Sequence, residues 1–162
     1  MGRTTRPGRG TALASRLRRA SSDFIVVIQP IDDRRWRHVS APGVWSISKD
    51  AEHVAEAASY HEWIVRLTIE ENVPSRRPPL ERRQMASDLS PGDAVVVIRR
   101  RAEDTARLLL DLTDRQLDLP TRPPRARAQR LEETIDRVLI GHYNTHRFEI
   151  EAKLRALGAG RR

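Results

Sequence analysis

Clusters of proline divide the chain into four long segments, and each segment repeats its apolar residues at steps of three and four. This spacing is typical of amphipathic helices, because residues three and four apart share one helix face. We predict helices over residues 12–29, 47–71, 93–112 and 128–157. Two short runs, 24–28 and 95–98, are strand-like when read alone, but a helical pattern continues around both. The sequence therefore predicts an all-α fold, an up-and-down four-helix bundle with long Pro- and Arg-rich connections.

The connection over residues 30–45 carries two tryptophans, Trp36 and Trp45. We expect these large side chains to hold the connection against the bundle. Ser46 or Ser48 is expected to cap the second helix, and Asp50 lies in its first turn, where the helix dipole favours a negative charge.

A chain of 162 residues is long enough for one domain with a real core. Only 4% of its residues are aromatic, so the core must be built from Ala, Val, Ile and Leu. We predict a bundle over residues 12–158, preceded by a disordered basic tail (1–11) and followed by a short C-terminal tail (159–162).

The net charge of +8 does not indicate a nucleic-acid domain, because the excess lies at the ends of the chain. Residues 1–20 hold six Arg and no acid, two more Arg end the chain, and residues 21–160 balance 22 basic against 22 acidic side chains. This distribution argues against a nucleic-acid partner, which would need a basic patch on the folded body. A weaker alternative is that the basic tails dock on an anionic partner.

The chain contains no cysteine, which excludes disulfides, Cys-ligated metals and a Cys nucleophile. It also has no apolar run long enough to span a membrane and no signal-peptide pattern, so we expect a cytoplasmic protein without membrane contact.

His142 and His146 are four residues apart in the last predicted helix, so their imidazoles share one face. His142 continues the predicted inward stripe of Leu131, Ile135 and Val138. One inward histidine is most often a core residue bonded to a neighbour, but two buried in register each need a polar partner. Such a pair can hold a divalent metal if a third ligand arrives from elsewhere.

His53, near the start of the second predicted helix, is also on an apolar face and is the best candidate for that third ligand. Three neutral imidazoles suit Zn²⁺, Ni²⁺ or Fe²⁺ and leave coordination positions open for water or substrate. His61, turned about 80° from His53 around the helix, ranks below these three as a pocket-lining residue. His38 is expected on the surface.

Glu149 follows His142 by seven residues and shares its helix face, so it is a candidate general base or a partner that orients a ligand. The alternative is an ordinary solvated helix glutamate. Tyr60 is a weaker catalytic candidate, and Asn144 is weaker still.

The order of these motifs resembles the DinB-like superfamily. Trp45-Ser46-Ile47 precedes His53 on the second helix, and His142 and His146 follow on the last. Residues 147–158, which end in Leu154-Arg155-Ala156-Leu157-Gly158, are also similar to the family's last helix. The resemblance covers residues 12–158. The superfamily includes mycothiol-dependent maleylpyruvate isomerase N-terminal domains and related thiol-dependent S-transferases.

The resemblance implies a four-helix bundle with an unusual helix order and one divalent metal, zinc or nickel, held by His53, His142 and His146. It also implies a homodimer and a low-molecular-weight thiol, such as mycothiol, as cofactor or substrate in S-transfer or isomerisation. Because the chain has no Cys, that thiol must be a small molecule, and its electrophile a second one. A non-catalytic metal-binding or stress-response module is the alternative.

Overall fold

The structure, a computed structural model, describes residues 8–70, 87–121 and 129–159, and helices dominate this part of the chain. The long elements are α1 (Arg9–Ile28), α3 (Ile47–Ile69), α4 (Pro91–Leu110) and α7 (Gly141–Ala159). α7 continues directly from α6 (Leu131–Thr134) and the π-helix η1 (Ile135–Ile140). The described residues form no strand, only an isolated bridge between Pro120 and Arg130. The predicted all-α bundle is confirmed.

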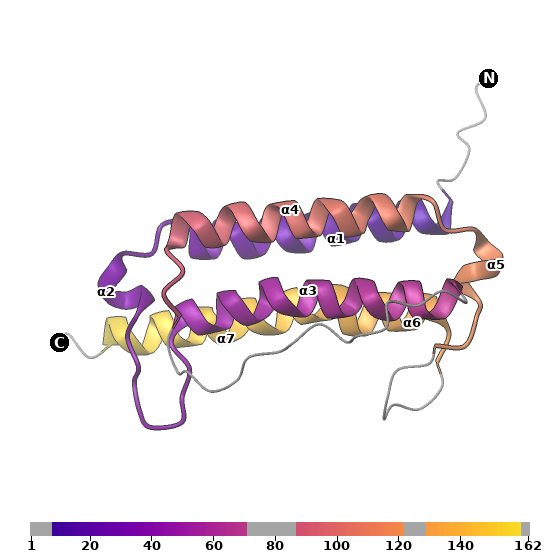
Figure 1. Cartoon of the computed structure of the whole chain (residues 1–162). Coiled ribbons are helices and arrows are strands. Elements are labelled where there is room, and N and C mark those ends of the chain that lie inside the picture. Colours follow the sequence, from indigo (N-terminus) through magenta and orange to yellow (C-terminus); the bar gives the residue numbers. More distant parts are fainter. Residues whose placement is uncertain (1–7, 71–86, 122–128, 160–162) are drawn as a thin grey trace, which may run out of the picture.

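The bundle consists of two antiparallel pairs, α1 with α4 and α3 with α7 (Figure 1). In the first pair the start of α1, at Gly10, meets the end of α4 at Leu109. In the second, Lys153 near the end of α7 reaches the carbonyl of Trp45, just before α3. Because α3 and α4 run in the same direction (Figure 1), the simple up-and-down prediction is wrong in helix order. The unusual order implied by the resemblance describes the fold better.

Serine side chains fix where two of the long helices begin. The Oγ of Ser46 accepts a hydrogen bond from the backbone N–H of Lys49 at 3.2 Å, so Ser46 is the cap of α3. Ser90 accepts from the backbone N–H of Asp93 at 3.1 Å and places a proline first in α4. Such caps satisfy amide groups that have no partner within the helix.

Two short helices lie where the sequence predicted only connections. α2 (Asp33–Trp36) follows the cap Asp32, and α5 (Asp114–Leu117) begins with a capping box of Thr113 and Gln116. Each buries one large side chain completely, Trp36 in α2 and Leu117 in α5. Trp36 also donates from Nε1 to the carbonyl of Leu89 at 2.6 Å, which confirms that this tryptophan holds the 30–45 connection against the bundle.

The core is aliphatic, as the composition required, with few aromatic exceptions. Its largest fully buried side chains outside the short helices include Leu17, Phe24, Ile28, Ile47, Ile98, Leu109, Leu131, Ile135 and Ile150. Phe24 of α1 meets Tyr143 of α7 edge to face, with ring centroids 6.1 Å apart. This contact lies one residue from His142, so the core packing supports the helix that carries two of the three histidines.

The π-helix η1 changes which residues of the last helical rod point inward. Its i→i+5 hydrogen bonds accommodate more residues per turn than an α-helix, so a 3.6-residue period does not apply across it. The predicted inward position of Val138 is therefore wrong: this side chain is 41% exposed, whereas Leu139 and Ile140 are buried. Single π turns inside α-helices are frequent at functional sites, and this one ends immediately before Gly141 and His142.

The first helix begins at Arg9, three residues earlier than predicted, so part of the predicted 1–11 tail belongs to the bundle. Arg9 explains the early start, because its guanidinium pairs with Asp118 at 2.8 Å and with Glu132. These contacts lower the pKa of both carboxyls, chiefly through the hydrogen bonds from Arg9. Residues 1–7 and 160–162 of the predicted tails, and the predicted helix ends at 71 and 128, lie outside the described residues.

Gly10 is required where α1 meets the end of α4. A Cβ atom at this position would lie 2.4 Å from the carbonyl oxygen of Leu109 and 3.1 Å from that of Leu112. We expect Gly10→Ala to lower the free energy of unfolding by about 1–3 kcal/mol, because backbone must move to admit the methyl group. Urea unfolding measures the change. The matched control is Gly92→Ala, since the nearest atom to a Cβ there is 3.9 Å away; equal stability for both variants would contradict the close contact.

Candidate metal centre

His53, His142 and His146 come together between α3 and α7. The ring centroids of His53 lie 5.0 Å from His142 and 5.1 Å from His146, and the last two are 4.5 Å apart. One ring nitrogen from each residue lies within 4.8 Å of the others. The structure thus brings together the three residues that the sequence singled out; their role as metal ligands stays a prediction.

The environment keeps His142 neutral. Burial lowers its pKa to about 2, and the neighbouring His146, His61 and His53 add to this shift. A low-dielectric site disfavours the imidazolium form, and nearby like charges disfavour it further. A metal binds only the neutral ring, so this environment favours ligation and opposes competition from protons.

Two nitrogens in the cluster have no hydrogen-bond partner among the described residues, although both are buried. They are Nε2 of His142 and Nδ1 of His146. An unsatisfied buried polar atom costs free energy, so native proteins rarely leave one without a reason such as an ion. The residues therefore fit a divalent metal in donor type, protonation state and placement.

His61 also joins the cluster, although it ranked below the other three histidines in the sequence. Its side chain is buried and its ring centroid lies 5.2 Å from that of His142. Burial, followed by the nearby His53, lowers its pKa to about 4. A sequence signal was present, because His61 continues the buried stripe of Val54, Ala58 and Val65 at helical spacing. The cavity beside it holds only about 10 Å³, room for no more than one water.

Glu149 lies against His146, one turn further along α7. Its Oε2 atom is 2.8 Å from Nδ1 of His146, although that nitrogen has no hydrogen-bond partner among the described residues. A carboxylate behind a ligating histidine orients the ring and raises its basicity. The orienting role and the general-base role of Glu149 both stay predictions.

Tyr60, the second catalytic candidate, packs against other rings of α3. Its ring stacks on Trp63 at 5.7 Å and lies 6.0 Å from His61. It therefore approaches the cluster through His61. A catalytic role for Tyr60 stays a prediction.

A buried charged network that the sequence did not predict borders the histidines. Asp50 is 2% exposed and forms an ion pair with Lys153 of α7. Burial raises the pKa of Asp50, while the hydrogen bond and charge of Lys153 oppose that shift. In the sequence Asp50 was only a first-turn acid, because pairing between distant helices has no local signature.

Trp45 closes the site on the other side of His53, with the two ring centroids 5.1 Å apart. Behind it lies a cavity of about 270 Å³ between the 38–47 segment and the end of α7. Its walls are His38, Ser40, Trp45, Ile47, Lys153, Ala156 and Leu157. His38 is exposed, as predicted, but it lines a cavity next to the candidate centre.

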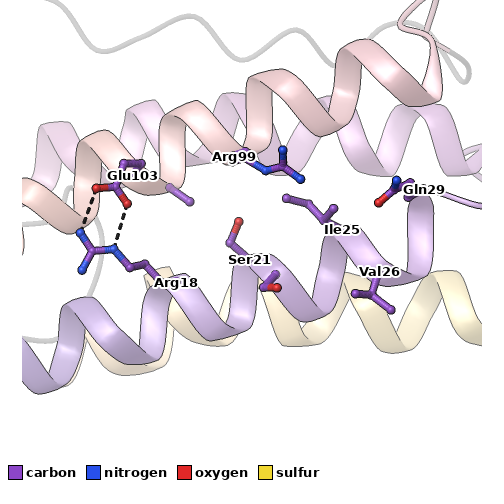
Figure 2. A pocket seen from close by; sticks show the side chains of 9 residues that line it. Arg18, Ser21, Ile25, Val26, Gln29, Arg99 and Glu103 are labelled. Atoms are coloured by element: carbon purple, nitrogen blue, oxygen red, sulfur yellow. Dashed lines mark hydrogen bonds and ion pairs between the residues drawn. The ribbon is translucent and has the colours of Figure 1, made fainter.

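A separate hollow of about 420 Å³ lies between α1 and α4, the helix pair that carries none of the clustered histidines (Figure 2). Arg18 and Glu103 span it with two hydrogen bonds of 2.8 and 2.9 Å. α1 and α4 together carry eight Arg against four acidic residues, and α1 includes four of the six Arg of residues 1–20, so this part of the basic excess belongs to the helical body and not to a tail. The hollow shares no residue with the histidine cluster.

None of the helices in the described part of the chain combines the length and apolar character needed to cross a membrane.

The fold and the site together define a class of protein, the four-helix bundles in which histidines from two facing helices gather at one point. The chain belongs to the DinB superfamily, whose sequence profile matches residues 16–150 and so includes all three histidines. YfiT from Bacillus subtilis, described as a probable metal-dependent hydrolase with an unusual four-helix bundle topology, has a similar structure. Its TM-score is 0.77 at 17% identity, over 98% of this chain and 93% of YfiT, a likeness of fold. A search of curated protein sequences gives no significant match.

Proposed function

We propose that this chain binds one divalent metal through His53, His142 and His146, and that it is an enzyme acting on a small-molecule thiol. The observation that carries the proposal is the convergence of these imidazoles, two of which hold buried nitrogens without hydrogen-bond partners. Zinc or nickel suits this set of neutral nitrogen donors. Three protein ligands leave room for an exogenous ligand, as in catalytic rather than structural sites.

When bound, the metal supplies Lewis-acid chemistry, which favours the thiolate or hydroxide form of a small ligand. The chain's own residues prepare the site for it. Burial keeps His142 in the neutral form that ligates. The carboxylate of Glu149 lies 2.8 Å from Nδ1 of His146, and the ring of Trp45 packs against that of His53.

The choice of a thiol rests on composition and kinship. The chain has no cysteine, so a sulfur nucleophile must come from a small molecule. Mycothiol or a similar low-molecular-weight thiol, transferred to an electrophile or used in isomerisation, is the chemistry implied by the resemblance. A homodimer and a cytoplasmic location belong to the same proposal.

Metal-dependent hydrolysis is the second candidate, and the likeness to YfiT favours it, since that protein is described as a probable metal-dependent hydrolase. The same open position would then hold water rather than a thiol. A non-catalytic metal-binding module is the third outcome that an activity test must separate.

Zn²⁺- or Ni²⁺-loaded protein mixed with a thiol and a model electrophile tests these alternatives. We expect thioether formation at least about tenfold faster than with the His142→Ala variant, because the metal favours the thiolate. Mycothiol, glutathione and cysteine are compared, and an activated ester without thiol reports hydrolysis. Ester cleavage alone would replace the thiol proposal with hydrolysis. If neither assay gives a rate above background, the result would support the non-catalytic metal-binding module.

A further inference from the structure

A second group of metal-ligand side chains overlaps the three histidines. Asp50, His146 and Glu149 each place one donor atom within 4.8 Å of the others, so His146 belongs to both groups. His146 is only 8% exposed, and its Nδ1 atom, without a hydrogen-bond partner, lies 2.8 Å from the Oε2 atom of Glu149. Asp50 is buried on the same side.

The two groups differ in the cations that they prefer. The histidine group offers only nitrogen, which suits zinc and nickel. The second group offers two carboxylates and one imidazole, and its oxygen donors suit hard cations such as Mn²⁺ and Mg²⁺. A protein with both groups open would have two competing destinations for metal ions.

Lys153 already places a positive charge in the second group. It lies four residues after Glu149 and seven after His146, on the same face of α7. Its ammonium forms an ion pair with Asp50 and donates a hydrogen bond to the carbonyl of Trp45 at 2.9 Å. A buried carboxylate needs such a counter-charge, because an unpaired charge inside a protein is costly.

We propose that Lys153 is a built-in cation that keeps a second, carboxylate-lined site for a hard divalent cation closed, and so confines metal to the three histidines. The ammonium and a divalent ion are alternatives at Asp50, because both neutralise the same buried carboxylate. The carbonyl of Trp45 holds the ammonium from a second direction. Lys153 is thus a specificity-determining residue, and this inference rests on the proposed function only in taking His146 as a ligand of the first group.

Removal of this charge tests the proposal, with Mn²⁺ as the ion and the electron paramagnetic resonance signal of free Mn²⁺ as the measure of uptake. The wild-type chain is expected to leave the signal nearly unchanged. Lys153→Met and Lys153→Gln are expected to bind Mn²⁺ at least about tenfold more tightly, because the buried carboxylate of Asp50 then lacks its counter-charge. The glutamine keeps an N–H donor for the carbonyl of Trp45.

Three further variants separate the site from a general change in charge. Lys153→Arg keeps the cation and is expected to exclude Mn²⁺ like the wild type. The double variant Asp50→Asn with Lys153→Met is expected to lose the gained binding. Arg155→Met, which removes an exposed cation of the same helix, is the matched control and is expected to show no gain.

Folded Lys153→Met and Lys153→Gln proteins that exclude Mn²⁺ as the wild type does would overturn the proposal, as would a gain that survives in the double variant. If neither single variant folds alone, added Mn²⁺ must restore its helical circular dichroism; no recovery would equally overturn it. Zn²⁺ binding by the wild type is measured separately. Its absence would refute the proposed function while leaving the Mn²⁺ result as the test of Lys153.

Discussion

His142→Ala is expected to lower the affinity for Zn²⁺ or Ni²⁺ by more than about 100-fold. Removal of a residue that only hydrogen-bonds to a metal ligand typically costs about 10–100-fold in affinity, and removal of the ligand itself should cost more. The ring of His142 lies between those of His53, His146 and His61, all within 5.2 Å between centroids. Burial lowers its pKa to about 2, so no proton competes with the metal for this ring in the neutral range. Competition with a chromophoric chelator at neutral pH measures the affinity.

His38→Ala is the matched control for this prediction. His38 is exposed and lies at the cavity behind Trp45 rather than in the cluster, so its loss should leave metal affinity within about twofold of the wild type. His53→Ala and His146→Ala should behave as His142→Ala does. Equal affinity in the wild type and all three cluster variants would show that the metal binds elsewhere.

Phe24→Ala is expected to lower the free energy of unfolding by about 3–5 kcal/mol, the usual cost of deleting a buried aromatic ring. Phe24 is fully buried in α1, and it meets the ring of Tyr143 edge to face. The truncation therefore removes core volume and a packed aromatic pair at once. Such a loss is a large fraction of the 5–15 kcal/mol that typically stabilises a domain.

Urea unfolding followed by circular dichroism measures this loss. Val26→Ala on the same helix is the control, because its side chain is 67% exposed and should change stability by less than about 0.5 kcal/mol. A similar small change for Phe24→Ala would contradict the placement of Phe24 in the core.

The sequence predicted what depends on local periodicity. Apolar spacing located the long helices and turned His53, His142 and His146 inward, and the structure brings these three together. Capping chemistry located the start of α3, because serine followed by an acidic first turn is a local signal.

The features that the sequence missed depend on contacts between distant segments or on irregular helix geometry. Val138 was placed inward because a 3.6-residue period was extended across the π-helix η1. The pairing of Asp50 with Lys153 joins residues 103 apart, and neither helix pattern contains it. Arg9 was assigned to a tail because its partners, Asp118 and Glu132, lie at the other end of the chain.

His61 illustrates a different limit. Its helical angle from His53 suggested another face of the second helix, but the packed bundle places His142 between the two rings. The direction of a side chain on one helix cannot show how a neighbouring helix approaches it. The buried stripe to which His61 belongs was a better guide than its angle from His53.

The metal content of the purified wild-type protein tests the central claim most directly. Protein prepared without chelators, then analysed for elements by mass spectrometry, is expected to hold about one zinc or nickel ion per chain, as three protein ligands with an open position define one catalytic-type site. Protein stripped with a chelator should regain the same amount from Zn²⁺ or Ni²⁺. A preparation that holds no divalent metal and takes up none from either ion would contradict the three-histidine centre.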